Sequence, residues 1–189
     1  MVMNHPVRFI IVTFSILTCF TVCGQRLIDK AAYVRFFSEA PLENIEAVNN
    51  EAMGVLDLSS GKVAVSMSMK RFKFEKSLME EHFNENYIES DKFPKGTFSG
   101  TLVNFDQDGL SELTDSVSYV AKGDLTIHGV TKPLETEVWL KKEGEKLVWR
   151  TVFEVDVASF DIEIPKMVVM NIAEQVEVTA IFQFDLNTP

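Results

Sequence analysis

Three stretches of this sequence, residues 62–69, 147–157 and 176–184, alternate between apolar side chains and mostly polar ones. In an extended strand successive side chains point to opposite faces, so each stretch presents one apolar face and one wet face. Strands of this kind are typical of antiparallel sheets that bury only one side. The alternation therefore predicts an all-β fold whose core lies between the apolar faces.

Other strand-like runs bring the expected number of strands to about eight. These further strands are expected at residues 33–38, 53–58, 97–104, 118–128 and 134–141. Clusters of Gly, Asp, Ser or Pro predict turns at residues 59–61, 106–109, 129–133 and 143–145. Connections of hairpin length favour antiparallel neighbours. Closure into a barrel of about eight strands would remove exposed edges and leave an interior that is packed or holds a slim ligand. Periodicity alone also allows a two-sheet sandwich.

Residues 76–89 have a different pattern. Apolar residues spaced as on one face of a helix are Leu78, Met79, Phe83 and Tyr87. This spacing predicts one short amphipathic helix, the only helix expected in the domain. Just before it, over residues 69–72, the strand alternation slips by one position, which predicts a bulge or a bend.

The first 24 residues have the pattern of a secretory signal peptide. Arg8 precedes an apolar run that ends at Val22. This run is too short to cross a bilayer core of roughly 30 Å comfortably. We therefore expect a signal peptide over residues 1–24 and a single exported domain over residues 25–189, in the periplasm or outside the cell and without stable membrane insertion.

Both cysteines of the chain, Cys19 and Cys23, lie at the end of that apolar run. They leave a lipidated form open as an alternative, and a retained anchor is another. After cleavage the domain would have no cysteine, hence no disulfide, and two histidines, His82 and His128. The full chain has a formal net charge of −10, and this acidic balance argues against nucleic acid and anionic membrane surfaces as partners.

Two motifs carry a resemblance to a known family. Residues 122–133 read KGDLTIHGVTKP, and residues 83–94, which follow His82, read FNENYIESDKFP. The first is similar to a signature hairpin. The second is similar to a passage in which a helix with a histidine ends before a Ser-x-x-aromatic-Pro step. Both belong to the YceI-like family, and the order of elements resembles that family over about residues 30–186.

The resemblance implies a lipocalin-like antiparallel barrel with a helix near one end. Members are typically exported bacterial proteins whose apolar interior is associated with polyisoprenoid chains or fatty acyl derivatives. The family has no defining catalytic motif, so the resemblance implies no catalytic residue. We therefore expect an exported, non-enzymatic protein that binds a long apolar ligand and needs no cofactor. A ligand-free envelope interaction module and an enzyme acting on an isoprenoid-like substrate are the alternatives, and a homodimer is left open.

The expected ligand-binding residues lie on the apolar faces of the strands and on the helix. Methionines suit a deformable pocket because their side chains are unbranched, although the same residue types also fill ordinary cores. The predicted binding residues are Val65, Met67, Met69, Phe72, Phe74, Met79, Phe83, Phe98, Leu125, Ile127, His128, Trp149, Phe153, Phe160 and Phe182.

Few residues suggest polar chemistry. His128 ends a predicted strand before a turn, where it would contact a ligand head group or make a structural hydrogen bond that fixes the hairpin. Residues 70–76, KRFKFEK, form the one basic cluster, which would meet an anionic head group or guard an exposed strand edge. His82 has no second histidine or cysteine at a suitable offset, so no metal site is expected.

Overall fold

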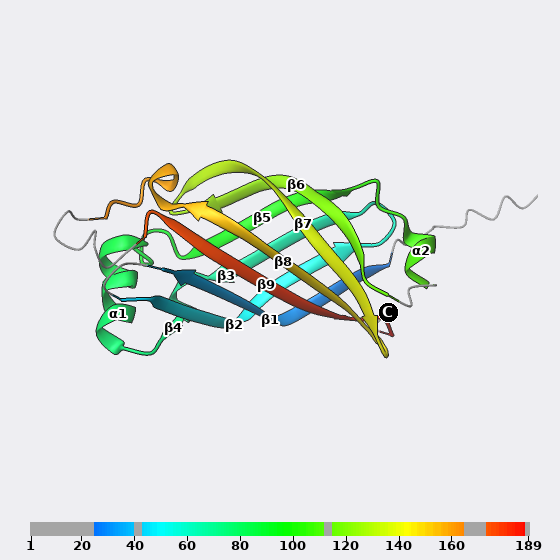
Figure 1. Ribbon diagram of the computed structural model, residues 1–189, viewed down its shortest axis with the longest axis horizontal. Helices are drawn as coiled ribbons and strands as arrows, with labels where there is room; N and C mark the ends of the chain where they lie inside the picture. The colour runs from blue at the N-terminus through cyan, green and yellow to red at the C-terminus, as the bar shows by residue number, and fades with distance from the viewer. Residues whose placement is uncertain (1–24, 40–42, 112–114, 165–172, 188–189) are drawn as a thin grey trace, which may run out of the picture.

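The computed structural model describes residues 25–39, 43–111, 115–164 and 173–187. The predicted signal peptide, residues 1–24, lies outside the described residues. The described chain forms an elongated barrel of slanting antiparallel strands with a short helix at each end (Figure 1). The strands are β1 Arg26–Ser38, β2 Ile45–Asp57, β3 Lys62–Ser68, β4 Lys73–Phe74, β5 Lys95–Val103, β6 Val117–Ile127, β7 Val130–Glu143, β8 Lys146–Asp156 and β9 Gln175–Asp185.

The sheet closes on itself. Its order is β1-β9-β8-β7-β6-β5-β3-β2, and β2 also pairs with β1, so these eight strands form a continuous wall. The short β4 only extends the sheet, pairing with β2 at Ala47 and Val48. The prediction of an all-β, eight-stranded antiparallel barrel is confirmed, and the pairing of β1 with β2 excludes the sandwich.

The first two strands are longer than predicted, because the sequence pattern showed only residues 33–38 and 53–58. The register between β1 and β2 shifts between Asp29 and Ala32, and again between Ala32 and Val34. Such irregularities put an extra residue into one strand and break the strict alternation of faces. The early strands therefore carry a weaker sequence signal than the later ones.

The predicted bend over residues 69–72 is confirmed. A single 3-10 turn, η1 Met69–Arg71, interrupts the chain between β3 and β4. Because of this turn, Met69 and Phe72 are both buried although they are three positions apart. The slip in the alternation is thus caused by the 3-10 turn, where the chain changes direction between β3 and β4.

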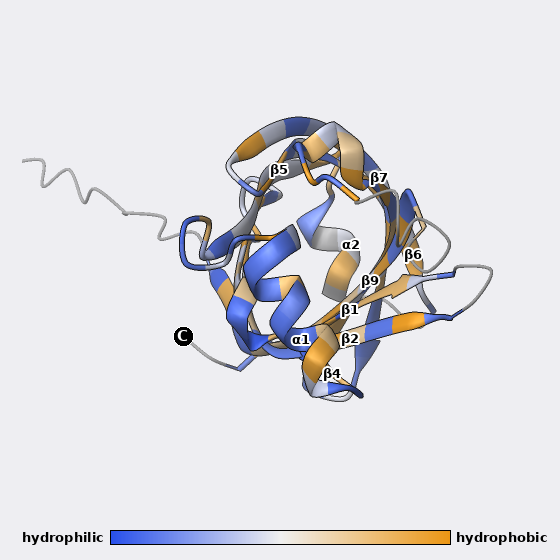
Figure 2. Ribbon diagram, turned by 90° about the vertical axis from the view of Figure 1, so that its left-hand side faces the viewer, coloured by the Kyte–Doolittle hydropathy of each residue, from blue (hydrophilic) through white to orange (hydrophobic). Residues whose placement is uncertain are grey.

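The predicted helix over residues 76–89 is present as two segments, α1 Ser77–His82 and a π-helical turn, η2 Phe83–Tyr87. They lie across one open end of the barrel, as the end-on view shows (Figure 2). Leu78 was expected on the buried face, but its side chain is 59% exposed. That part of the prediction is wrong, and the inward face is carried by Met79, Phe83 and Tyr87.

Two predicted turns are wrong in detail. Residues 106–109 do not form a tight reversal, because a short helix, α2 Gln107–Ser111, begins there and buries Leu110 at the other end of the barrel. The turn expected at residues 129–133 consists only of His128 and Gly129, whose φ angles are 52° and 76°. Pro133 lies within β7, on a stretch that is not paired with β8, so its missing N–H costs no ladder hydrogen bond.

The interior is filled at the α2 end. Fully buried side chains from five strands meet there: Leu27, Leu56, Leu140, Leu147 and Phe184. Next to them the rings of Phe182 and Phe184 lie parallel, with centroids 6.0 Å apart. A Cβ atom added to Gly54 would lie only 2.4 Å from the Phe182 ring. The missing side chain at Gly54 therefore lets Phe182, carried by β9, lie against β2.

Gly54→Ala should destabilise the protein by about 1–3 kcal/mol, the usual cost of overpacking a core, because the Phe182 ring has to move. The same substitution should cost much less in a Phe182→Leu background, so the double-mutant cycle should be clearly non-additive. Urea denaturation of the four proteins measures both values. An equal cost of Gly54→Ala in the two backgrounds would show that the ring is not what requires a glycine there.

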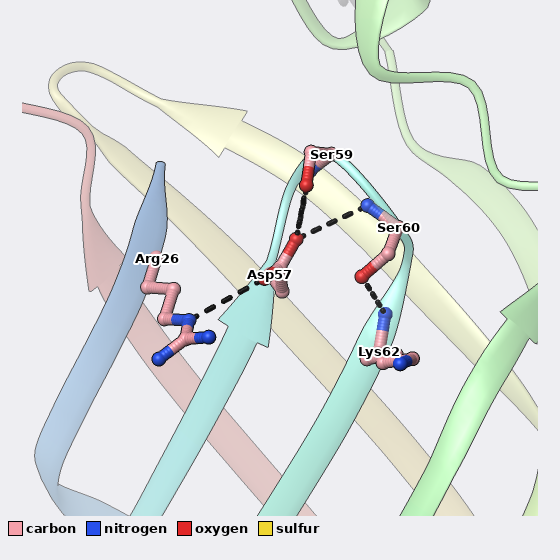
Figure 3. A network of polar contacts seen from close by, with 5 residues as sticks. All are labelled: Arg26, Asp57, Ser59, Ser60 and Lys62. Atoms are coloured by element: carbon pink, nitrogen blue, oxygen red, sulfur yellow. Dashed lines mark hydrogen bonds and ion pairs between the residues drawn. The ribbon is translucent and has the colours of Figure 1, made fainter. Parts of the chain in front are cut away.

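The turn between β2 and β3, at the filled end, is organised by Asp57 (Figure 3). Its carboxylate accepts hydrogen bonds from the Ser59 hydroxyl at 2.6 Å and from the backbone N–H groups of Ser59 and Ser60, both at 3.1 Å. The Nε atom of Arg26 lies 3.4 Å from the same carboxylate. These donors, with the Ser59 hydrogen bond as the largest cause, lower the pKa of Asp57 from 3.8 to about 2.

Because the pKa of Asp57 is lowered on folding, its charged form stabilises the fold above pH 4, and this contribution is lost as the pH falls to about 2. The free energy of unfolding of Asp57→Asn should therefore fall less steeply over that range than that of the wild type. Denaturant titrations at several pH values measure the slopes. In Ser59→Ala, NMR titration should show the pKa of Asp57 closer to 3.8, and an unshifted value would contradict the assignment of the main donor.

Candidate functional site

The barrel is hollow at the end covered by α1 and η2. A cavity of about 260 Å³ lies there, walled by inward-facing residues of the strands and covered by the helical segments. Most of its lining is aliphatic, aromatic or methionine side chains. The polar side chains among the described lining residues are Ser38, Glu43, His82 and Tyr87. Such a space suits an apolar molecule with a small polar part.

The structure brings together nine of the fifteen predicted binding residues. Those that line the cavity are Met67, Met69, Phe72, Phe74, Met79, Phe83, Leu125, Ile127 and Phe153. They come from β3, η1, β4, α1, η2, β6 and β8 and the residues between them, so the cavity depends on elements that are far apart in the sequence.

The other six predicted residues lie outside the lining: Val65, Phe98, His128, Trp149, Phe160 and Phe182. Trp149 and Phe182 lie on the inward face but belong to the filled half, where their ring centroids are 6.2 Å apart. Val65 and Phe98 are cross-strand partners packed against the same core. The alternation identifies the inward face of a strand but not the depth of a residue along the barrel, which explains the four strand residues among them. His128 lies in the turn after β6 and Phe160 in the segment after β8, outside the strands. A role in binding stays a prediction for the whole set.

Several lining residues were not predicted. They include β1 residues, residues at the ends of β8 and β9 and the residue directly after β8, namely Val34, Phe36, Ser38, Val155, Val157, Val176 and Val178. The valines from Val155 onward stand on faces that the alternation identifies as inward, so the signal for them was present. The β1 residues lie in the strand expected at residues 33–38, where two adjacent phenylalanines, Phe36 and Phe37, obscure which face points inward.

A cluster of phenylalanine rings holds the cover onto the wall. Phe83, at the start of η2, lies 5.4 Å from Phe36 of β1 and 5.1 Å from Phe74 of β4, measured between ring centroids. Phe72 completes the cluster at 5.3 Å from Phe36. Aromatic pairs at these separations stabilise a structure beyond the area they bury. The helical segments are thus fixed to the barrel by the same rings that line the cavity.

The basic cluster over residues 70–76 is fully paired. Each of its four cations contacts a carboxylate of another element, in the pairs Lys70–Asp91, Arg71–Glu51, Lys73–Glu80 and Lys76–Glu43. Glu43 also lines the cavity, and its contact raises the pKa of Lys76. The described part of the chain contains no group of three or more His, Cys, Asp or Glu side chains placed to hold a metal ion.

Comparison with known proteins assigns this barrel to a family. A family model described as the YceI-like domain matches residues 28–184, which is almost the whole of the described barrel. The chain belongs to the YceI-like family. No curated protein matched the sequence.

Solved structures share this YceI-like fold at low sequence identity. A polyisoprenoid binding domain from Saccharophagus degradans, implicated in plant cell wall breakdown, has a TM-score of 0.72 at 11% identity, covering 86% of this chain and 98% of its own. BcnA from Burkholderia cenocepacia has a TM-score of 0.68 at 13% identity, with coverages of 80% and 95%. The YCEI protein of Campylobacter jejuni has a TM-score of 0.57 at 13% identity, with coverages of 97% and 98%.

The two YceI-like motifs meet at His128. Its Nδ1 lies 3.1 Å from the carbonyl oxygen of Phe160, and its Nε2 lies 3.0 Å from the carboxylate of Glu89. The edge of the ring also meets Phe93, with centroids 4.4 Å apart. Because both ring nitrogens face acceptors, the two hydrogen bonds coexist when both nitrogens carry protons. The hydrogen bond from His128 is also the largest cause that lowers the pKa of Glu89.

His128 therefore joins three segments at the hollow end of the barrel: its own hairpin, the residues that follow η2, and η3 Val157–Phe160. These contacts hold the ring outside the lining of the cavity. No helix in the described part of the chain is long and apolar enough to span a bilayer.

His128→Asn should lower the free energy of unfolding, by about 1 kcal/mol for the hydrogen bond to the Phe160 carbonyl alone. Asparagine tolerates the left-handed φ of 52° at this position, so backbone strain should not contribute. NMR titration should also show the pKa of Glu89 closer to its ordinary value. Thr131→Val, which removes a hydrogen bond from the same hairpin without touching Glu89, is the control. An unchanged pKa of Glu89 in His128→Asn would contradict the proposed link.

Proposed function

We propose that this protein is an exported binding protein that holds the tail of a lipid-like molecule, such as an isoprenoid or fatty acyl chain, in the hollow half of its barrel. The observation that supports this most directly is the apolar cavity of about 260 Å³ beneath α1 and η2. Natural cores are packed with few voids larger than a water molecule, so a space of this size suggests an occupant. The polyisoprenoid binding domain from Saccharophagus degradans shares the fold and adds support for this ligand class.

The volume limits how much of a chain is buried. If a methylene group takes roughly the space of a water molecule in the liquid, about 30 Å³, a cavity of about 260 Å³ holds on the order of nine chain carbons. Each buried methylene contributes about 0.8 kcal/mol, so the tail would gain about 7 kcal/mol before the cost of immobilising it. A longer chain would extend through the mouth of the barrel.

Export is part of the proposal because residues 1–24 have the pattern of a signal peptide, which agrees with typical YceI-like proteins. We propose binding without catalysis, since the lining is mostly apolar. A ligand-free interaction module would need no hollow interior, so the cavity favours the carrier over that alternative.

Filling the cavity should abolish binding. Val155 lines the cavity, whereas its neighbour Glu154 points outward and is exposed. Val155→Trp should weaken the binding of N-phenylnaphthylamine, an uncharged fluorescent probe of apolar sites, by at least about tenfold, which is about 1.4 kcal/mol. Glu154→Trp adds the same side chain on the outer face of the same strand and should leave the affinity unchanged.

Circular dichroism and thermal unfolding check that both tryptophan variants are folded. Native mass spectrometry of the wild type purified from its own cells should find an amphiphile that is absent from Val155→Trp. Probe binding that is equal in the wild type and the folded Val155→Trp protein would mean that the cavity is not the binding site.

A further inference from the structure

Among the residues that the structure describes, the lining of the cavity offers little charge to a ligand's head group. The described lining residues include no lysine or arginine, and the one acidic residue among them is Glu43. The ammonium group of Lys76 is paired with Glu43, the acidic residue of the lining. Lys73, in the same rim segment, is paired with Glu80 at 2.6 Å. The protein's own carboxylates thus occupy the places that a carboxylate or phosphate head group would take.

The remaining polar side chains of the lining are suited to donate hydrogen bonds. The hydroxyl of Ser38, which is 1% exposed, accepts a hydrogen bond from the backbone N–H of Ala173 at 2.9 Å. Its own proton has no acceptor among the described residues, so it is free to donate to a ligand. The hydroxyl of Tyr87 likewise makes no hydrogen bond within the described part of the chain, and burial raises its pKa, so it stays protonated at neutral pH.

The Ser38 hydroxyl is buried, so its unpartnered proton is costly, and a ligand oxygen that accepts its hydrogen bond removes that cost. A carboxylate would also accept such bonds, but it would lose its hydration at an apolar site where the ammonium group of Lys76 is already paired with Glu43. An uncharged carbonyl or ether oxygen satisfies the donors at a lower desolvation cost. The distribution of charges and donors therefore distinguishes between head groups on the same apolar tail.

We propose that the cavity selects lipid-like molecules with an uncharged, hydrogen-bond-accepting head group, such as an amide or an ester, over carboxylates and phosphates with the same chain. This inference rests on the proposed binding function and adds the chemical class of the ligand's polar end. Glu43 is the specificity-determining residue, because its carboxylate is paired with Lys76 and keeps that cation from a ligand's anionic head group.

The test compares decanoate with decanamide, which have the same chain length, as competitors that displace N-phenylnaphthylamine at pH 8. The wild type should bind the amide about fivefold or more tighter than the carboxylate. In Glu43→Gln, which leaves Lys76 without its partner, the carboxylate should gain about fivefold relative to the amide. Glu51→Gln is the matched control, since it frees Arg71, which does not line the cavity, and should change neither affinity.

Carboxylate binding equal to or tighter than amide binding in the wild type, or an unchanged ratio in Glu43→Gln, would overturn the proposal. Lys132 is an exposed cation directly across from the lining residue Leu125 in the β6–β7 pairing. A loss of carboxylate binding in Lys132→Gln would also overturn the proposal, because it would show that this lysine binds an anionic head group. Failure of the carrier function itself is a separate result: neither competitor, nor the probe, would bind to the wild type.

Discussion

The contact between the Phe182 ring and the backbone of Gly54 helps determine which half of the barrel is filled and which half is hollow. A closed barrel of eight strands has only enough interior for its own side chains, so any space for a ligand has to be created by where the large residues lie. Phe182, with Trp149 and Phe184 beside it, concentrates aromatic volume at the α2 end. At the other end, valines, methionines and a cluster of phenylalanine rings line the wall and leave about 260 Å³ unfilled.

The architecture could be read from the sequence because alternation is a local signal. In β8 and β9 every second residue faces inward, and the strands and their limits followed from that pattern. The choice of a barrel over a sandwich came from the resemblance to the YceI-like family. The early strands could not be read equally well, because the register shifts around Ala32 in β1 interrupt the period. The helix at residues 107–111 was missed because its Asp-Gly sequence is equally typical of a turn, and the burial of Leu110 that favours a helix depends on distant residues.

The cavity was predictable in composition but not in position. Met67 and Phe153 were expected at the site and line it, while Phe182 was expected there on the same grounds and belongs to the filled half. The difference is one of depth along the barrel axis, which depends on strand register and on the tilt of every neighbour. Charge pairing is equally non-local: residues 70–76 look basic in the sequence, and only the fold shows that Glu43, Glu51, Glu80 and Asp91 neutralise them.

The position of the cavity at one end of the barrel limits how a bound molecule is oriented. Because side chains fill the α2 end, a chain bound as proposed would enter tail first and leave head first at the hollow end. Its head group would lie on the side of Ser38 and its tail on the side of Phe182. A ligand in this barrel would thus have one orientation, which a tunnel open at both ends would not impose.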